Sequence, residues 1–178
     1  MANEEEISIR PGKKEDIEEI LEIFKSARKY MREKNNLTQW SDDYPGEKDI
    51  LTDIKNGNSY IGIDKNRNIV MTFAFILGND PTYKIIKEGT WLNSQPYGTI
   101  HRIASNGKYK GVLKKACDYC FNFTDNIRID THEDNAPMLK ALDNIGFTKC
   151  GIINCRDGSP RIAFQKTKER HLIDKPTK

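Results

Sequence analysis

The chain has 178 residues, of which 37% are hydrophobic and 31% are charged, and its formal net charge is +3. This length fits one domain with a real core, and the mild charge argues against a nucleic-acid-binding protein, which would need an extended stripe of basic and aromatic side chains. No apolar run approaches the roughly 18 residues that span a bilayer, and the acidic start at residues 1–6 is unlike a signal peptide, so we expect a cytoplasmic protein without membrane or nucleic-acid partners.

The first half of the chain predicts strands and helices from two different periodicities. Alternating apolar residues indicate strands, and apolar residues three or four positions apart indicate amphipathic helices. A polar turn between two β-rich runs predicts an antiparallel hairpin. The predicted elements are a strand at 7–10, a helix at 14–31, a loop at 35–47, a short helix near 50–54, and hairpin strands at 59–64 and 69–77.

The second half continues the alternation of strands and helices after an irregular stretch at 78–96. The predicted elements are a strand at 99–104, a helix at 112–121, a strand at 127–131, a helix at 137–144, and strands at 148–155 and 161–165. The order β-α-α-β-β-β-α-β-α-β-β predicts an α/β fold, with a central mixed sheet flanked by helices. We expect one domain over residues 1–166 and a polar tail over 167–178.

The turn at residues 105–111 has the character of a phosphate-binding site. It follows a strand and opens a helix, whose first turn offers unpaired backbone N–H groups and the positive end of a dipole. Lysines surround this turn at positions 108, 110, 114 and 115. A solvated helix face is the alternative for Lys114 and Lys115. The turn suits a cofactor that carries several phosphate charges.

These segments resemble the GNAT superfamily, the acetyl-CoA-dependent N-acyltransferases. The glycine motif of that family aligns with residues 108–113, although Lys108 stands in place of Gln or Arg and Leu113 in place of Gly or Ala. The later signature, a strand followed by Asn, a helix and Gly-Phe, fits residues 127–147 better. The resemblance covers nearly the whole chain. It implies that coenzyme A contacts Ile103, Ala104, Ser105, Lys108, Tyr109, Lys110, Gly111, Val112 and Asn135.

The resemblance also implies where the acyl group lies. In the family two adjacent parallel strands splay apart, and backbone groups freed by the splay hold the pantetheine and the thioester oxygen. Here the splay is expected between residues 100–104 and 127–131, with Ile103 as the backbone contact. Asn135 resembles the family residue that hydrogen-bonds pantetheine, while its position before Pro137 also predicts a helix N-cap, and both roles can hold together.

An acceptor amine has a pKa near 10, so a base must remove its proton, an effect worth about 10² to 10⁴ in rate. His101 is the candidate catalytic base, because it lies on the strand beside the expected acyl group. Strict alternation would place His101 and Ile103 on one face, and Arg102 with Ala104 on the other. His132 and Glu133 could also reach the splay, although a solvated loop is the favoured reading for both.

Leu142 departs from the family pattern. Counting back from Gly146, GNAT enzymes often have Tyr at this position, where its hydroxyl can protonate the departing thiolate, and leucine cannot donate a proton. The resemblance as a whole implies an N-acetyltransferase that transfers the acetyl group of acetyl-CoA to a primary amine of a small molecule or peptide by direct attack, whereas Leu142 supports an alternative. The alternative is a catalytically degenerate GNAT domain that binds acyl-CoA as a sensor or interaction module.

Three loop aromatics lie in the segments expected to wall the acceptor site: Trp40, Tyr44 and Trp91. Such rings can line a pocket or attract a cationic amine, although buried packing is commoner.

The resemblance to the GNAT superfamily also implies a possible homodimer. The four cysteines, at positions 117, 120, 150 and 155, fall on an apolar helix face and in a β-prone segment, so we expect buried free thiols with no metal and no disulfide.

Overall fold

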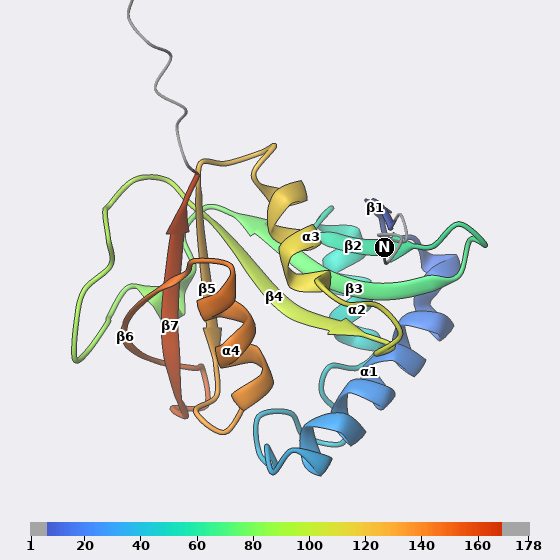
Figure 1. Cartoon of the computed structure of the whole chain (residues 1–178), viewed down its shortest axis with the longest axis horizontal. Helices are drawn as coiled ribbons and strands as arrows, with labels where there is room; N and C mark the ends of the chain where they lie inside the picture. Colours follow the sequence, from blue (N-terminus) through green and yellow to red (C-terminus); the bar gives the residue numbers. More distant parts are fainter. Residues whose placement is uncertain (1–6, 169–178) are drawn as a thin grey trace, which may run out of the picture.

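The computed structural model describes residues 7–168, which form a seven-stranded mixed sheet with helices on both faces (Figure 1). The acidic start at 1–6 lies outside the described residues, as do residues 169–178 of the tail expected over 167–178, whereas Thr167 belongs to the last strand. Within the described part, none of the helices has the length and apolar character needed to cross a bilayer.

The elements follow the predicted order. The strands are β1 (Ser8–Pro11), β2 (Ser59–Ile63), β3 (Ile69–Leu77), β4 (Gly98–Ser105), β5 (Asn126–Thr131), β6 (Thr148–Asn154) and β7 (Pro160–Thr167). The helices are α1 (Ile17–Glu33), α2 (Glu47–Lys55), α3 (Val112–Cys120) and α4 (Ala136–Asn144), with short 3-10 turns η1 (Lys14–Asp16) and η2 (Pro81–Tyr83). The predicted α/β fold is confirmed, with η2 inside the stretch expected to be irregular.

The first helix starts later than its apolar spacing suggests. Residues 14–16 form η1, and α1 begins at Ile17. Asp16 stabilises this 3-10 turn before the helix, because its carboxylate accepts hydrogen bonds from the Lys13 N–H at 2.7 Å and from the Arg10 guanidinium at 2.8 Å. The ion pair fastens the start of α1 to β1.

The strands lie in the order β1-β2-β3-β4-β5-β7-β6, and β4 with β5 is the one parallel pair. The predicted hairpin is confirmed, since β2 and β3 pair antiparallel. In the described chain, β4 and β5 pair only where Gly98 meets Ile127 and Thr99 meets Arg128. Beyond these two pairs the strands separate, which is the expected splay.

Strand β4 carries a bulge beside the splay. Ala74 of β3 lies opposite His101, whereas Thr72 lies opposite Ala104, so Arg102 and Ile103 together face the single residue between them. Arg102 has a φ of 52°, a left-handed conformation that is uncommon for a residue with a side chain. Such bulges bend a strand and redirect its side chains.

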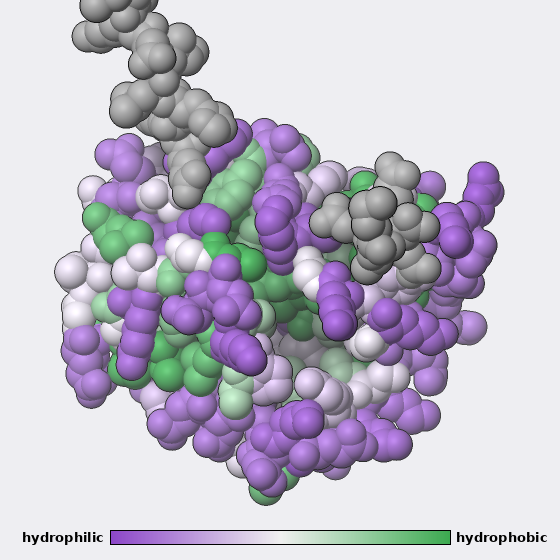
Figure 2. All heavy atoms as spheres, in the orientation of Figure 1, coloured by the Kyte–Doolittle hydropathy of each residue, from purple (hydrophilic) through white to green (hydrophobic). Residues whose placement is uncertain are grey.

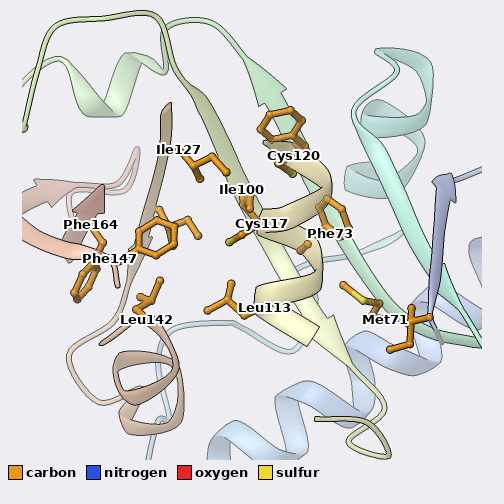
Figure 3. Packing of buried hydrophobic residues seen from close by; sticks show 14 of the residues in the cluster. Met71, Phe73, Ile100, Leu113, Cys117, Cys120, Ile127, Leu142, Phe147 and Phe164 are labelled. Atoms are coloured by element: carbon orange, nitrogen blue, oxygen red, sulfur yellow. The ribbon is translucent and has the colours of Figure 1, made fainter. Parts of the chain in front are cut away.

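The two larger apolar clusters pack on opposite faces of the sheet. The first lies under α3 and α4, and Figure 3 shows Leu113 and Leu142 projecting from these helices toward Ile100 and Ile127 of the sheet. The second lies under α1 and α2 and includes Ala104. Full burial of each large aliphatic side chain stabilises the fold by about 1.5–3 kcal/mol.

The cysteines are free, and three of them are buried, as the apolar pattern predicts. Cys117 and Cys120 point from α3 into the first cluster. Burial raises the pKa of Cys117 to about 12, so its thiol stays protonated at neutral pH. A protonated, buried thiol is a packing group rather than a nucleophile.

Candidate functional site

A hollow lies over β4 between α3 and α4, with an apolar floor and a polar rim (Figure 2). Half-buried side chains from all three bordering elements pack on the first cluster, namely Ile103 of β4, Val112 of α3 and Met138 of α4. The hollow therefore coincides with the splay and offers apolar surface with unpaired strand edges beneath it. An extended molecule with a flexible, partly polar arm fits such a place.

The turn at the mouth of this hollow presents the start of α3. Gly111 is the N-cap, with a φ of 71°, and no side chain caps the helix. Its first N–H groups are thus left for solvent or a ligand. Lys108 and Lys110 are exposed beside it. The turn holds its own shape, because Ser105 Oγ accepts from the Gly107 N–H at 3.3 Å. Backbone donors and two lysines make the turn suitable for phosphate groups.

Lys114 and Tyr109 of this segment have structural partners. Lys114 forms an ion pair with Asp118 at 2.6 Å on the exposed face of α3. The Tyr109 hydroxyl donates to Asp64 at 3.0 Å, which ties the turn to the β2–β3 hairpin. The predicted cofactor contact of Tyr109 stays a prediction, and it would have to come from the backbone or ring.

Asn135 is buried at the start of α4, where its predicted N-cap role is confirmed. Its Oδ1 accepts from the Met138 N–H at 3.3 Å, and its Nδ2 donates to Gln39 Oε1 at 2.9 Å. Gln39 belongs to the loop between α1 and α2, so the N-cap also joins two segments that are far apart in sequence. Its predicted contact with pantetheine stays untested.

His101 and Asp80 form a hydrogen-bonded pair on the other side of β4. His101 Nε2 lies 2.8 Å from Asp80 Oδ2, and the two side chains are 22% and 16% exposed. Thr82 donates to the other carboxylate oxygen through its N–H and its hydroxyl. Burial raises the pKa of Asp80, but the hydrogen bonds from His101 and Thr82 outweigh it and hold the pKa at about 2. Asp80 is therefore a carboxylate at neutral pH and accepts from His101.

That protonation state decides which ring nitrogen is basic. A carboxylate only accepts hydrogen bonds, so the neutral ring carries its proton on Nε2 and keeps a lone pair on Nδ1. No residue between 7 and 168 makes a hydrogen bond to Nδ1. His101 can thus accept a proton from a molecule that lies against it.

A buried tyrosine packs beside this pair. Tyr83 lies with its ring 6.2 Å from the His101 ring, and its hydroxyl donates to Asp130 of β5 at 2.6 Å. Burial and the Asp130 carboxylate raise the pKa of Tyr83 well above its ordinary value, so it stays protonated. The Tyr83 hydroxyl therefore serves as a donor to Asp130 and is not itself a base.

The bulge changes the predicted alternation of β4. Arg102 projects toward α2, where it forms a bidentate pair with Asp53 at 2.6 and 3.0 Å, and it donates to the Tyr44 hydroxyl at 3.3 Å. Ile103 packs on the first cluster instead, and His101 does not accompany it there. The expectation that His101 and Ile103 share a face is wrong, because the extra residue at the bulge shifts the alternation between them.

The predicted acceptor-wall aromatics occupy three environments. Trp40 is only 8% exposed and packs edge-on against Phe24 and Tyr44. Tyr44 is partly exposed beside Arg102. Trp91 donates to the Tyr83 carbonyl at 3.0 Å and stacks on the Arg128 guanidinium. Packing explains both tryptophans, and contact with an acceptor stays a prediction for all three.

His132 is less suited to act as a base. Its Nδ1 accepts from the Asp134 N–H at 3.1 Å, and its Nε2 lies 3.4 Å from Thr38 Oγ1. Both ring nitrogens are thus occupied, while Glu133 is exposed in the turn. Within residues 7–168 no group of three acidic, histidine or cysteine side chains could hold a metal ion.

Comparison with protein-family models gives no match for this chain. Comparison with curated proteins gives none either. Among solved structures, an acetyltransferase of the GNAT family from Streptococcus agalactiae is 31% identical, with a TM-score of 0.83 over 92% of this chain and 96% of that one. The chain belongs to the GNAT family. The family supports acetyl transfer as its general activity.

More distant structures share the GNAT fold. An acetyltransferase from Listeria monocytogenes is 19% identical, with a TM-score of 0.68 over 94% of this chain and 98% of that one. A ribosomal-protein-S5-alanine acetyltransferase from Vibrio fischeri is 17% identical, with a TM-score of 0.57 over 92% and 93%. At these identities the likeness concerns the fold alone.

Sequence reasoning missed several residues of this GNAT site. Asp80 and Tyr83 come from the stretch expected to be irregular, and Asp53 and Asp130 carried no motif. The Asp-Pro pair at residues 80–81 is a signal that was overlooked, because Asp80 is the N-cap of η2 and Pro81 is its first residue. Only the fold brings Asp80 to His101, because 21 residues separate them along the chain.

Proposed function

We propose that the chain transfers the acetyl group of acetyl-CoA to a primary amine of a small molecule or peptide by direct attack. The turn before α3 has the donors and lysines to receive the phosphates, and the hollow over the splay offers apolar surface to the acyl arm. The separation of β4 from β5 beside the His101–Asp80 pair is the observation that carries this proposal.

In this mechanism the lone pair of the neutral amine attacks the thioester carbonyl carbon, and the nitrogen of the tetrahedral adduct then gives up its second proton to solvent. The attack requires that the ammonium has first lost one proton. His101 Nδ1 accepts that proton, and Asp80 stabilises the imidazolium that forms through its hydrogen bond to Nε2. The carbon–sulfur bond then breaks, and its electron pair leaves with the thiolate. The thiolate takes up a proton from solvent, since coenzyme A with an ordinary thiol pKa near 8.5 is a fair leaving group. The products are the acetamide and free coenzyme A.

The proposal is tested by measuring thiol release from acetyl-CoA with a panel of amines, peptides and aminoglycosides. With an accepted amine, we expect His101→Gln to lower kcat by about 10²- to 10⁴-fold while the Kd of CoA stays unchanged. His132→Gln is the matched control, because both nitrogens of that ring have local partners. Equal decreases of kcat in the two variants would exclude His101 as the base.

A second function is favoured by Leu142. This side chain is fully buried in the first cluster, and it occupies the position of the hydroxyl donor that GNAT enzymes often have. A domain without that acid could bind acyl-CoA as a sensor or interaction module. CoA binding without turnover on any amine would favour this alternative, and absence of CoA binding would contradict both functions.

A further inference from the structure

The loop between α1 and α2, residues 34–46, is fastened to the distant end of the sheet through Gln39. Its Oε1 accepts from Asn36 Nδ2 at 2.7 Å and from Asn135 Nδ2 at 2.9 Å, and its Nε2 donates to Thr131 Oγ1 at 3.4 Å. The backbone carbonyl of Gln39 also accepts from Arg161 at 3.4 Å. One half-buried glutamine thus joins the loop to β5, α4 and β7.

The direction of these hydrogen bonds is set by the helix. The Met138 N–H can only donate, so it requires Asn135 to present Oδ1 to it. Asn135 must then direct Nδ2 toward the loop, where Gln39 Oε1 receives it. Gln39 in turn has only Nε2 to offer Thr131. The orientation of each amide therefore depends on the next one.

We propose that Gln39 is a positioning residue that fixes the Asn135 amide and couples the α1–α2 loop to the acyl-CoA side of the site. Thr131 ends β5 and Asn135 caps α4, and both of these elements border the splay and the hollow above it. This inference rests on the proposed function, which places acetyl-CoA there. Occupation of the splay would stabilise the arrangement of Thr131 and Asn135 that holds the loop.

Thermodynamic linkage makes this coupling reciprocal. We call the loop seated when Gln39 is hydrogen-bonded to Thr131 and Asn135. If bound CoA stabilises the seated loop, then the seated loop must increase the affinity for CoA by the same factor. Trp40 follows Gln39 directly and is buried between the rings of Phe24 and Tyr44, so it reports on the seating of the loop. Loss of the Gln39 amide should weaken CoA binding by about 5- to 10-fold, at the lower end of ordinary coupling between sites.

The test uses two substitutions of Gln39 in the full chain. Gln39→Met keeps the length of the side chain and removes its hydrogen bonds, whereas Gln39→Glu keeps an acceptor for Asn36 and Asn135. Calorimetry measures the Kd of CoA in each variant. Trp40 emission, read in a Trp91→Phe background, reports on the loop as CoA is added. Thermal unfolding confirms that each variant is folded.

We expect CoA to change Trp40 emission in the parent, which is the chain that retains Gln39. The Gln39→Met variant should bind CoA about 5- to 10-fold more weakly, and CoA should not change its Trp40 emission. Gln39→Glu should recover both properties. A Gln39→Met variant with the parent Kd and the parent emission response would overturn the coupling. Absence of CoA binding in the parent itself would overturn the proposed function, which is a distinguishable result.

Discussion

Replacement of Asp80 by asparagine reverses the polarity of the His101 hydrogen bond. Thr82 donates twice to Oδ1, so the new amide would keep its oxygen there and direct its NH₂ group at His101 Nε2. His101 would then carry its proton on Nδ1 and lose the lone pair that accepts the proton of the amine. We expect Asp80→Asn to lower kcat by about 10²- to 10⁴-fold, which corresponds to about 2.7–5.5 kcal/mol of barrier.

The same substitution should remove a pH-dependent part of the stability. The pKa of Asp80 is about 2 in the folded chain and has an ordinary value of 3.8. The difference is equivalent to at most about 2.5 kcal/mol, and we expect about 1–2 kcal/mol because solvent screens this partly exposed group. A lowered pKa stabilises the fold above pH 4, and that stabilisation disappears as the pH falls from about 4 to 2.

Urea unfolding between pH 2 and pH 7 measures this contribution. The difference in the free energy of unfolding between the parent and Asp80→Asn should shrink from about 1–2 kcal/mol at pH 7 to near zero at pH 2. Asp118→Asn is the control, since it removes an exposed carboxylate of α3 and should change stability by about 0.5 kcal/mol or less. A difference that is constant with pH, or an Asp80→Asn enzyme with parental kcat, would refute the reasoning.

Three further predictions concern the hollow, the turn and the bulge. Leu142→Ala should cost about 2–5 kcal/mol in urea unfolding, because this fully buried side chain would leave a cavity. Gly111→Ala and Gly158→Ala should each cost about 1–2 kcal/mol, since both have a positive φ, but only Gly111→Ala should raise the Kd of CoA in calorimetry. Asp53→Ala should cost about 3–5 kcal/mol in urea unfolding by leaving Arg102 buried without its carboxylate partner, and an unchanged midpoint would contradict that role.

Much of the fold could be predicted because local patterns and the sheet agree. The alternation in residues 59–64 and 69–77 describes a hairpin that pairs along its length, and the amphipathic spacing of α1 describes the face that packs on β3 and β4. Gly111 and Asn135 are the N-caps at which α3 and α4 begin, as their chemistry allows. In these places short-range preference and long-range packing require the same backbone.

The candidate site was less predictable because long-range contacts decide it. Strand periodicity assumes that each residue of a strand lies opposite one residue of its neighbour, and the bulge at Arg102 breaks that assumption. A left-handed conformation is usually marked by glycine in the sequence, and this position holds arginine. The position of His101 in a strand and the near-neutral pKa of imidazole in general point to this residue as a base. Asp80 lies beside it only because the connection between β3 and β4 folds back onto β4. Gln39 belongs to no sequence motif that would predict a role for its amide. The role follows only from the hydrogen bonds that the folded chain makes between Gln39 and Asn135 and Thr131.

The two-residue contact between β4 and β5 has a consequence for how the molecule opens. Four strands on one side of that junction and three on the other are each held by antiparallel ladders. The junction itself depends on two residue pairs, on packing, on the α1–α2 loop and on the strap at residues 78–97. Asn93 in this strap binds Asn126, Arg128 and Gln165 of the far half. We therefore expect amide hydrogens on the two sides to exchange as two cooperative units, with those along the junction exchanging first.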